Sequence, residues 1–90
     1  MKVRRHFVVS GRVQGVFFRQ SSRQQAKLLE LSGWVRNLPD GSVEIEAAGQ
    51  ADAMAEFEQW LSQGPENARV DSLNRLPPED DALLFPFEVR

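Results

Sequence analysis

The stretch GWVRNLPDGSVEIEAAG, residues 33–49, decides the fold of this 90-residue chain. It contains two extended segments, GWVRN and SVEIEAAG, separated by the four residues LPDG. Pro39 supplies the fixed φ of position i+1 in a type I turn, and Asp40 and Gly41 complete the pattern. The two segments are therefore predicted to form a β-hairpin.

The second segment of this hairpin alternates in hydropathy. Val43, Ile45 and Ala47 alternate with Glu44 and Glu46. This period of two predicts a strand with one buried face and one face in water. We therefore interpret Glu44 and Glu46 as a solvated strand face and not as a metal site or a catalytic carboxylate pair.

The elements outward from the hairpin complete a repeated pattern. They are a strand at 5–11, a helix at 17–29, a helix at 52–63, a strand at 68–76, and a short last strand within 81–90 that Pro86 places at a sheet edge. The order β-α-β-β-α-β with an extra short strand is that of the ferredoxin-like α+β sandwich. We expect one domain over residues 1–90, with both helices on one face of a mostly antiparallel sheet.

Composition limits the classes of function. The net charge of −2 gives no global field for nucleic acid or anionic lipid, so an anion site would have to be local. The absence of cysteine excludes a disulfide framework, thiolate catalysis and cysteine metal sites, and is compatible with a reducing cytoplasm. No apolar run approaches the ~20 residues of a membrane span. A monomer is the default expectation.

The segment GRVQGVFFRQ, residues 11–20, connects the first strand to the first helix. A loop that feeds a helix start exposes backbone N–H groups without helical partners, and the helix dipole adds positive potential there. Gly15 can adopt the bend that turns consecutive N–H groups inward, and Arg19 can grip two phosphate oxygens. From these residues alone, an ordinary tight connection remains an alternative to a phosphate site. The segment matches neither a Walker loop nor a dinucleotide fingerprint.

Other polar residues are candidates for a site. Asn37 ends a strand, where its amide could position a water or simply start the turn. His6 lies in an apolar strand without a nucleophile partner, which favours a structural role. The acidic run Glu79, Asp80 and Asp81 is predicted to be an exposed loop. The sequence shows no convincing metal cluster.

At this point the chain resembles the acylphosphatase family over nearly its whole length. GRVQGVFFR resembles the family's first signature, and GWVRNLPDGSVEIEAAG resembles its second. The resemblance continues through FEQWLSQGPENARV to FPFEVR. It implies a ferredoxin-like fold and the hydrolysis of acyl phosphates to a carboxylate and inorganic phosphate, without metal or cofactor. Inorganic phosphate is then expected as product and inhibitor.

The resemblance also implies roles for individual residues. Arg19 resembles the catalytic, phosphate-binding arginine of the family, and Asn37 resembles its water-orienting asparagine. The loop that resembles the phosphate cradle consists of Gln14, Gly15, Val16, Phe17 and Phe18, followed by Arg19. Glu30 departs from the pattern, because family members often have a glycine there that suits a left-handed helix cap.

Three rival interpretations stay open at this level. The chain could be a non-catalytic anion-binding domain of the same fold, or it could regulate a partner protein. RNA binding on this fold would need exposed aromatic residues and a basic surface. The slight negative charge and the glutamates of SVEIE argue against RNA.

Overall fold

The computed structural model describes residues 1–79 and 85–90. The elements are β1 (Lys2–Arg12), α1 (Phe18–Leu28), β2 (Ser32–Asn37), β3 (Val43–Gln50), α2 (Ala51–Leu61), β4 (Arg69–Leu76) and β5 (Glu88–Val89). Of the two helices among these residues, neither has the length and apolarity needed to cross a membrane.

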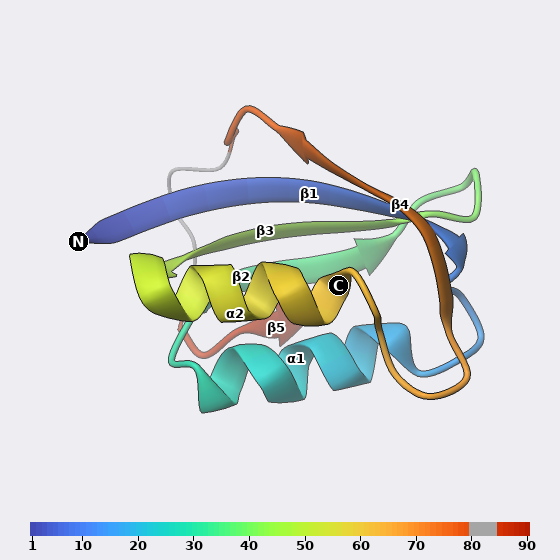
Figure 1. Cartoon of the computed structure of the whole chain (residues 1–90), viewed down its shortest axis with the longest axis horizontal. Helices are drawn as coiled ribbons and strands as arrows, with labels where there is room; N and C mark the ends of the chain where they lie inside the picture. The colour runs from blue at the N-terminus through green and yellow to red at the C-terminus, as the bar shows by residue number, and fades with distance from the viewer. Residues whose placement is uncertain (80–84) are drawn as a thin grey trace.

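The described strands form a five-stranded sheet in the order β4-β1-β3-β2-β5, with α1 and α2 packed on one face (Figure 1). β1 pairs antiparallel with β3 and β4, β2 pairs antiparallel with β3, and β5 pairs parallel with β2. The predicted ferredoxin-like α+β fold is confirmed, including the position of the short last strand at an edge.

The hairpin at the centre of the sheet forms where the sequence predicted it. The Gly41 N–H donates to the Leu38 carbonyl at 3.1 Å, which closes the turn around Pro39. Leu38 N–H then donates to the Ser42 carbonyl at 2.8 Å. The turn therefore fixes the register in which Asn37 pairs with Val43 at the end of β2.

The core lies between the sheet and the helices. Phe7, Val35 and Ile45 face it from the strands and are fully buried. Phe57 of α2 reaches across to Phe87, with ring centroids 6.0 Å apart. Burying such aromatic rings supplies much of the driving force of a small domain. The chain just before β5 is thereby fixed to the helix layer.

The opposite face of the sheet corrects one prediction. Glu44 and Glu46 were expected in solvent, but they are only 8% and 1% exposed. The segment after β4 passes over them, because the Pro77 carbonyl contacts the His6 ring and the Glu79 N–H donates to Glu46 Oε1 at 3.2 Å. Strand alternation assigned these glutamates to the correct face but could not show that later residues cover it. Glu79 itself is exposed, as predicted, whereas Asp80 and Asp81 lie outside the described residues.

The topology determines where a site can form. β1 and β2 both run antiparallel to β3, so they are parallel to each other, and β5 is parallel to β2. The carboxyl ends of all three strands therefore meet at one edge of the sheet. The β1–α1 loop, Asn37 and the chain end after β5 are brought together at that edge.

Candidate active site

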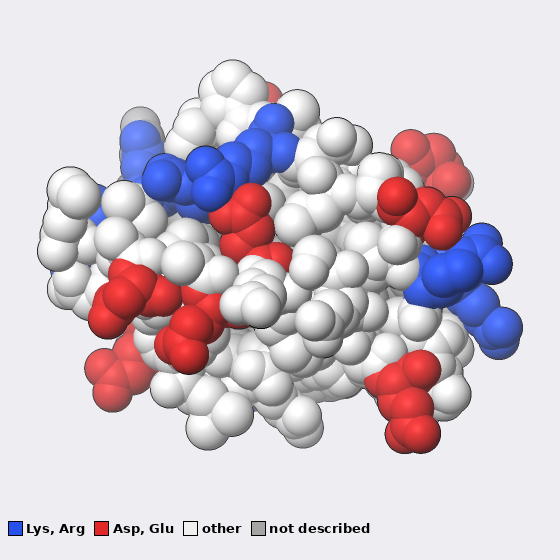
Figure 2. Space-filling view, in the orientation of Figure 1, with Lys and Arg blue, Asp and Glu red and all other residues white. Residues whose placement is uncertain are grey.

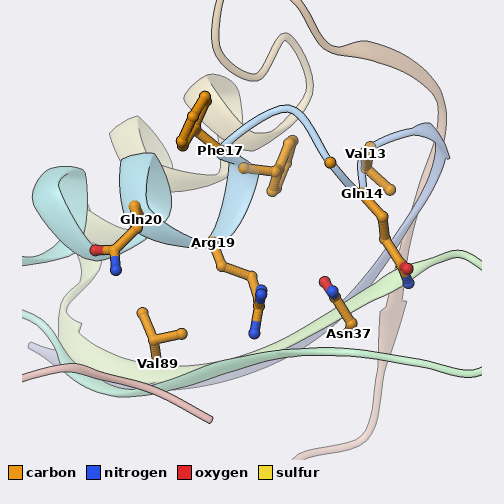
Figure 3. A pocket seen from close by; sticks show the side chains of 9 residues that line it. Val13, Gln14, Phe17, Arg19, Gln20, Asn37 and Val89 are labelled. Atoms are coloured by element: carbon orange, nitrogen blue, oxygen red, sulfur yellow. The ribbon is translucent and has the colours of Figure 1, made fainter.

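A cavity of about 320 Å³ opens at this edge, between the start of α1 and the ends of β2 and β5 (Figure 3). It is lined by Val13, Gln14, Gly15, Phe17, Phe18, Arg19, Gln20, Asn37 and Val89. All the predicted site residues line this cavity except Val16, whose side chain is buried and 6% exposed and whose predicted contact is through the backbone N–H.

The loop before α1 has the bent backbone that an anion cradle requires. Gly15 has a φ of 74° and Phe17 a φ of 62°, so two left-handed residues alternate with ordinary ones. None of the backbone N–H groups of residues 15–20 has an acceptor in the part of the chain that the structure describes. A concave run of free N–H groups at a helix start favours a bound anion.

Arg19 lies in the first turn of α1 and is half-buried. Its side chain extends into the cavity between the loop and the end of β2 (Figure 3). Nη1 donates to the carbonyl oxygen of Arg90 at 3.3 Å. This single contact leaves most of the guanidinium's donors available, while it holds the group at the cavity.

Asn37 forms the other wall of the cavity. It is the last residue of β2, and its side chain is exposed and points toward Arg19 (Figure 3). Its side-chain amide has no hydrogen-bond partner among the described residues. An amide with both a free donor and a free acceptor can hold a water molecule in a fixed orientation.

The side chain of Gln14 has a role separate from the phosphate binding that is predicted for the backbone amides of its loop. Its side-chain Nε2 donates to the Leu38 carbonyl at 2.9 Å and to the Ser42 carbonyl at 2.8 Å. Both N–H groups of the side chain are therefore used by the hairpin turn. Gln14 therefore connects the cradle loop to the turn that follows Asn37. This contact holds the loop wall of the cavity next to the wall formed by Asn37.

The sequence did not single out Val13, Gln20 and Val89, although all three line the cavity. The Arg90 carbonyl that contacts Arg19 was also missed. Val13 and Gln20 flank the loop that the sequence did identify. Nothing in the sequence indicated that the last strand would pair with β2 and reach the site.

The chemistry of the cavity is set by the side chains that line it. Among the described lining residues Arg19 is the only ionisable one. The described residues contain no group of three His, Asp or Glu side chains that could hold a metal ion. The cavity thus offers hydrogen-bond donors and one fixed positive charge, and no group there exchanges a proton near neutral pH.

The single histidine lies in a buried polar cluster on the opposite face of the sheet. His6 Nε2 lies 2.7 Å from Glu44 Oε2, and Nδ1 lies 3.1 Å from the Pro77 carbonyl oxygen. Burial alone would lower the pKa of His6, but these hydrogen bonds and the charges of Glu44 and Glu46 outweigh it and raise the pKa. Because both partners are acceptors, both ring nitrogens can donate only when His6 is protonated, so these contacts favour its charged form. This supports the structural role predicted for His6.

Glu44 is the centre of this cluster. Burial would raise the pKa of Glu44, but hydrogen bonds from His6 and Arg36, together with their charges, lower it overall. Arg36 Nε donates to Glu44 Oε1 at 2.6 Å. The cluster is therefore a buried carboxylate that contacts His6 on one oxygen and accepts a hydrogen bond from Arg36 on the other.

Comparisons with known proteins show which family the chain is similar to. The profile of the acylphosphatase family matches residues 5–83. The chain belongs to the acylphosphatase family. An acylphosphatase from Rubrobacter xylanophilus is 57% identical over 82 residues, covering 91% of this chain and 74% of the relative. An acylphosphatase from Alkalilimnicola ehrlichii is 49% identical over 89 residues, covering 93% of this chain and 100% of the relative.

A solved structure agrees with the fold of the family. The structure of an acylphosphatase from Coxiella burnetii superposes with a TM-score of 0.85 at 43% identity, covering 99% of this chain and 93% of that one. The family resemblance seen in the two signature stretches is confirmed.

Proposed function

We propose that this member of the acylphosphatase family hydrolyses acyl phosphates to a carboxylate and inorganic phosphate, by attack of a water molecule that Asn37 positions. The observation that carries the proposal is one cavity that combines free N–H groups, a guanidinium and a free amide. Family membership makes the chain a hydrolase of this class, and the geometry supports the roles of individual residues.

The phosphoryl group would be held by the loop and Arg19. The N–H groups from Gly15 to Arg19 lack acceptors, and the dipole of α1 favours negative charge at the same place. The planar guanidinium of Arg19 can bind two equatorial oxygens at once. Because these donors are in place before the reaction, they stabilise the charge that spreads over the phosphoryl oxygens in the transition state.

The absence of an acid or base near neutrality among the described lining residues fits this substrate class. The leaving group of an acyl phosphate is a carboxylate, whose conjugate acid has a pKa of about 4, so it departs without being protonated. The protein then needs only to hold the phosphoryl group and align the water. Accordingly, kcat is expected to show no protein pKa near 7.

Binding of an anion without turnover remains the rival function, and RNA binding is not favoured. In the space-filling view, Lys and Arg side chains share the face with Asp and Glu side chains, and uncharged surface lies between them (Figure 2). This face is not the basic surface that RNA recognition requires. A hydrolysis assay separates catalysis from silent binding.

The test is turnover of benzoyl phosphate by the purified wild type, with EDTA present, beside variants of Arg19. Arg19→Ala is expected to lower kcat/KM by at least ~10²–10³, the typical cost of one preorganised donor. Arg19→Lys is expected to lower kcat/KM to a similar extent, since the ammonium group of lysine cannot bind two phosphoryl oxygens at once as a planar guanidinium does. Arg12→Ala, an exposed arginine outside the cavity, is the control and should be near wild type.

Two outcomes would overturn the proposal. An inactive wild type that still binds inorganic phosphate would indicate an anion-binding domain. A Lys variant with near wild-type kcat/KM would remove Arg19 from the mechanism. Inhibition by inorganic phosphate, action of residues 1–90 as one domain, a monomeric state and a cytoplasmic location stay predictions.

A further inference from the structure

A second cavity, of about 440 Å³, continues from the first along α1. One wall is the chain at 85–89, and the other is formed by Gln20 and Arg23 of α1. Gln20 and Val89 line both cavities, so the two spaces adjoin. We call this second cavity the α1 groove.

The reaction geometry directs the acyl group toward the α1 groove. In an in-line displacement the departing oxygen lies opposite the attacking water. Asn37 lies on one side of Arg19, and Gln20 and Val89 lie on the other (Figure 3). A phosphoryl group held at Arg19, with water at Asn37, therefore has its acyl group on the side where the α1 groove begins.

We propose that the α1 groove binds the acyl group, and that Arg23 selects acyl groups carrying a second negative charge. The inference rests on the proposed function, because it needs a phosphoryl group at Arg19. It assigns to this chain a preference among acyl phosphates that the phosphate cradle alone cannot provide.

The charges in the α1 groove support an anionic group there. Arg23 is half-buried, and its guanidinium has no hydrogen bond or ion pair with any described residue. Glu88, the carboxylate of the same groove, accepts a hydrogen bond from Arg90 Nε at 2.8 Å and is thus already paired with a cation. Arg23 and Arg90 outnumber Glu88 here, so the local charge of these three side chains is positive, and within residues 1–79 and 85–90 Arg23 has no partner.

The dimensions and the apolar wall fit a short acyl group. Arg23 follows Arg19 by four residues on α1, so both lie on one helix face about 6 Å apart along the axis. Val89, Pro86 and the exposed Phe85 form an apolar wall beside this face. An aromatic ring can lie against that wall while a carboxylate at its far end reaches Arg23.

The test compares benzoyl phosphate with 4-carboxybenzoyl phosphate, which differ only by the distal carboxylate and cannot cyclise. kcat/KM is measured for both with the wild type, Arg23→Gln and Lys27→Gln. Lys27→Gln is the matched control. It removes one positive charge, as Arg23→Gln does, but one turn further along α1 at an exposed position outside the groove. Arg23→Gln is expected to lower kcat/KM for the carboxylated substrate by at least about tenfold, since a hydrogen bond to a charged group corresponds to roughly 10–150-fold.

The same variant should change benzoyl phosphate turnover by less than about twofold, and Lys27→Gln should change neither. A direct contact should also keep most of the difference at high salt, where long-range attraction is screened. Equal losses for both substrates in Arg23→Gln, or equal effects of Arg23→Gln and Lys27→Gln, would overturn the selection by Arg23. Failure of the proposed function is distinct, since the wild type would then hydrolyse neither substrate.

A second variant tests the wall of the groove. Phe85→Ala is expected to lower kcat/KM for both aromatic substrates by ~3–10-fold while leaving acetyl phosphate, which is too small to reach the wall, nearly unchanged. If Phe17→Ala instead lowers kcat/KM for the aromatic substrates and Phe85→Ala does not, the acyl group lies at the rim of the loop. That result would overturn the assignment of the groove.

Discussion

Glu30 ends α1 in a left-handed conformation, with a φ of 59°. Its N–H donates to the Lys27 carbonyl at 3.1 Å, and the Leu31 N–H donates to the Ala26 carbonyl at 2.8 Å. These two bonds are the Schellman pattern, in which the left-handed residue is usually glycine. The sequence identified this departure, and the structure shows that the backbone keeps the left-handed cap with a residue that has a Cβ.

Replacing Glu30 with glycine is therefore expected to stabilise the protein. Relief of the left-handed strain should raise the free energy of unfolding by about 1 kcal/mol, or Tm by about 4–8 °C in a domain of this size. Glu30→Ala is the control, because it removes the carboxylate and keeps the Cβ. Thermal unfolding that gives equal gains for the two variants would assign the effect to charge instead of backbone strain.

Asn37 and Arg19 line the same cavity but are expected to act at different stages of the reaction. Asn37→Ala should lower kcat by at least tenfold while changing inhibition by inorganic phosphate by less than about threefold, since water placement matters to the transition state and not to phosphate binding. Steady-state kinetics with phosphate as inhibitor measures both. Equal losses in the two quantities would make Asn37 a phosphate-binding residue.

Between elements, the decisive contact is the one from the cradle loop to the hairpin turn through Gln14. Gln14→Met keeps the length of the side chain but removes the bonds from Gln14 to the Leu38 and Ser42 carbonyls, each of which keeps its backbone donor in the turn. The cradle loop and the end of β2 are then no longer held in a fixed position relative to each other. We therefore expect kcat to fall about tenfold or more, with a smaller change in KM. The variant's circular dichroism spectrum should stay that of the wild type.

The matched control is Gln24→Met, an exposed glutamine of α1 that lies outside both cavities and forms no side-chain bond with a described residue. It should retain most of the wild-type kcat on benzoyl phosphate. A Gln14→Met enzyme with normal kcat would show that the loop holds its position without the hairpin turn.

The elements also show what the sequence could and could not predict. Local rules were sufficient for the hairpin at Pro39, for the bend at Gly15 and for the strand and helix order, because each depends on neighbours in the sequence. The two signature stretches predicted Arg19 and Asn37 as site residues. The pairing of β5 beside β2 was not readable, because it depends on the long-range contact that buries Phe87 against Phe57.

Across the whole molecule, the two faces of the sheet carry different chemistry. The helix face is an apolar core, whereas the other face buries His6 and Glu44 beneath the chain that follows β4. The period of the strand predicted which residues share that face, but only the tertiary path of residues 77–79 makes it interior. A buried ion pair formed in this way makes stability depend on pH, although the cavity at the sheet edge lies elsewhere.

The direction of that dependence follows from His6. Its pKa is raised above the ordinary value of 6.5 in the folded protein, so its contribution is fully present below 6.5 and is lost as pH rises through the folded-state value. Tm of the wild type should therefore fall on the alkaline side of pH 6.5. His6→Gln keeps a donor toward Glu44 but cannot titrate. Below pH 6.5 the Tm of this variant should be lower than that of the wild type, and above pH 6.5 it should change little with pH. Thermal unfolding of both proteins from pH 5.5 to 9 measures the difference, and parallel curves would show that the His6–Glu44 pair is not the source of the pH dependence.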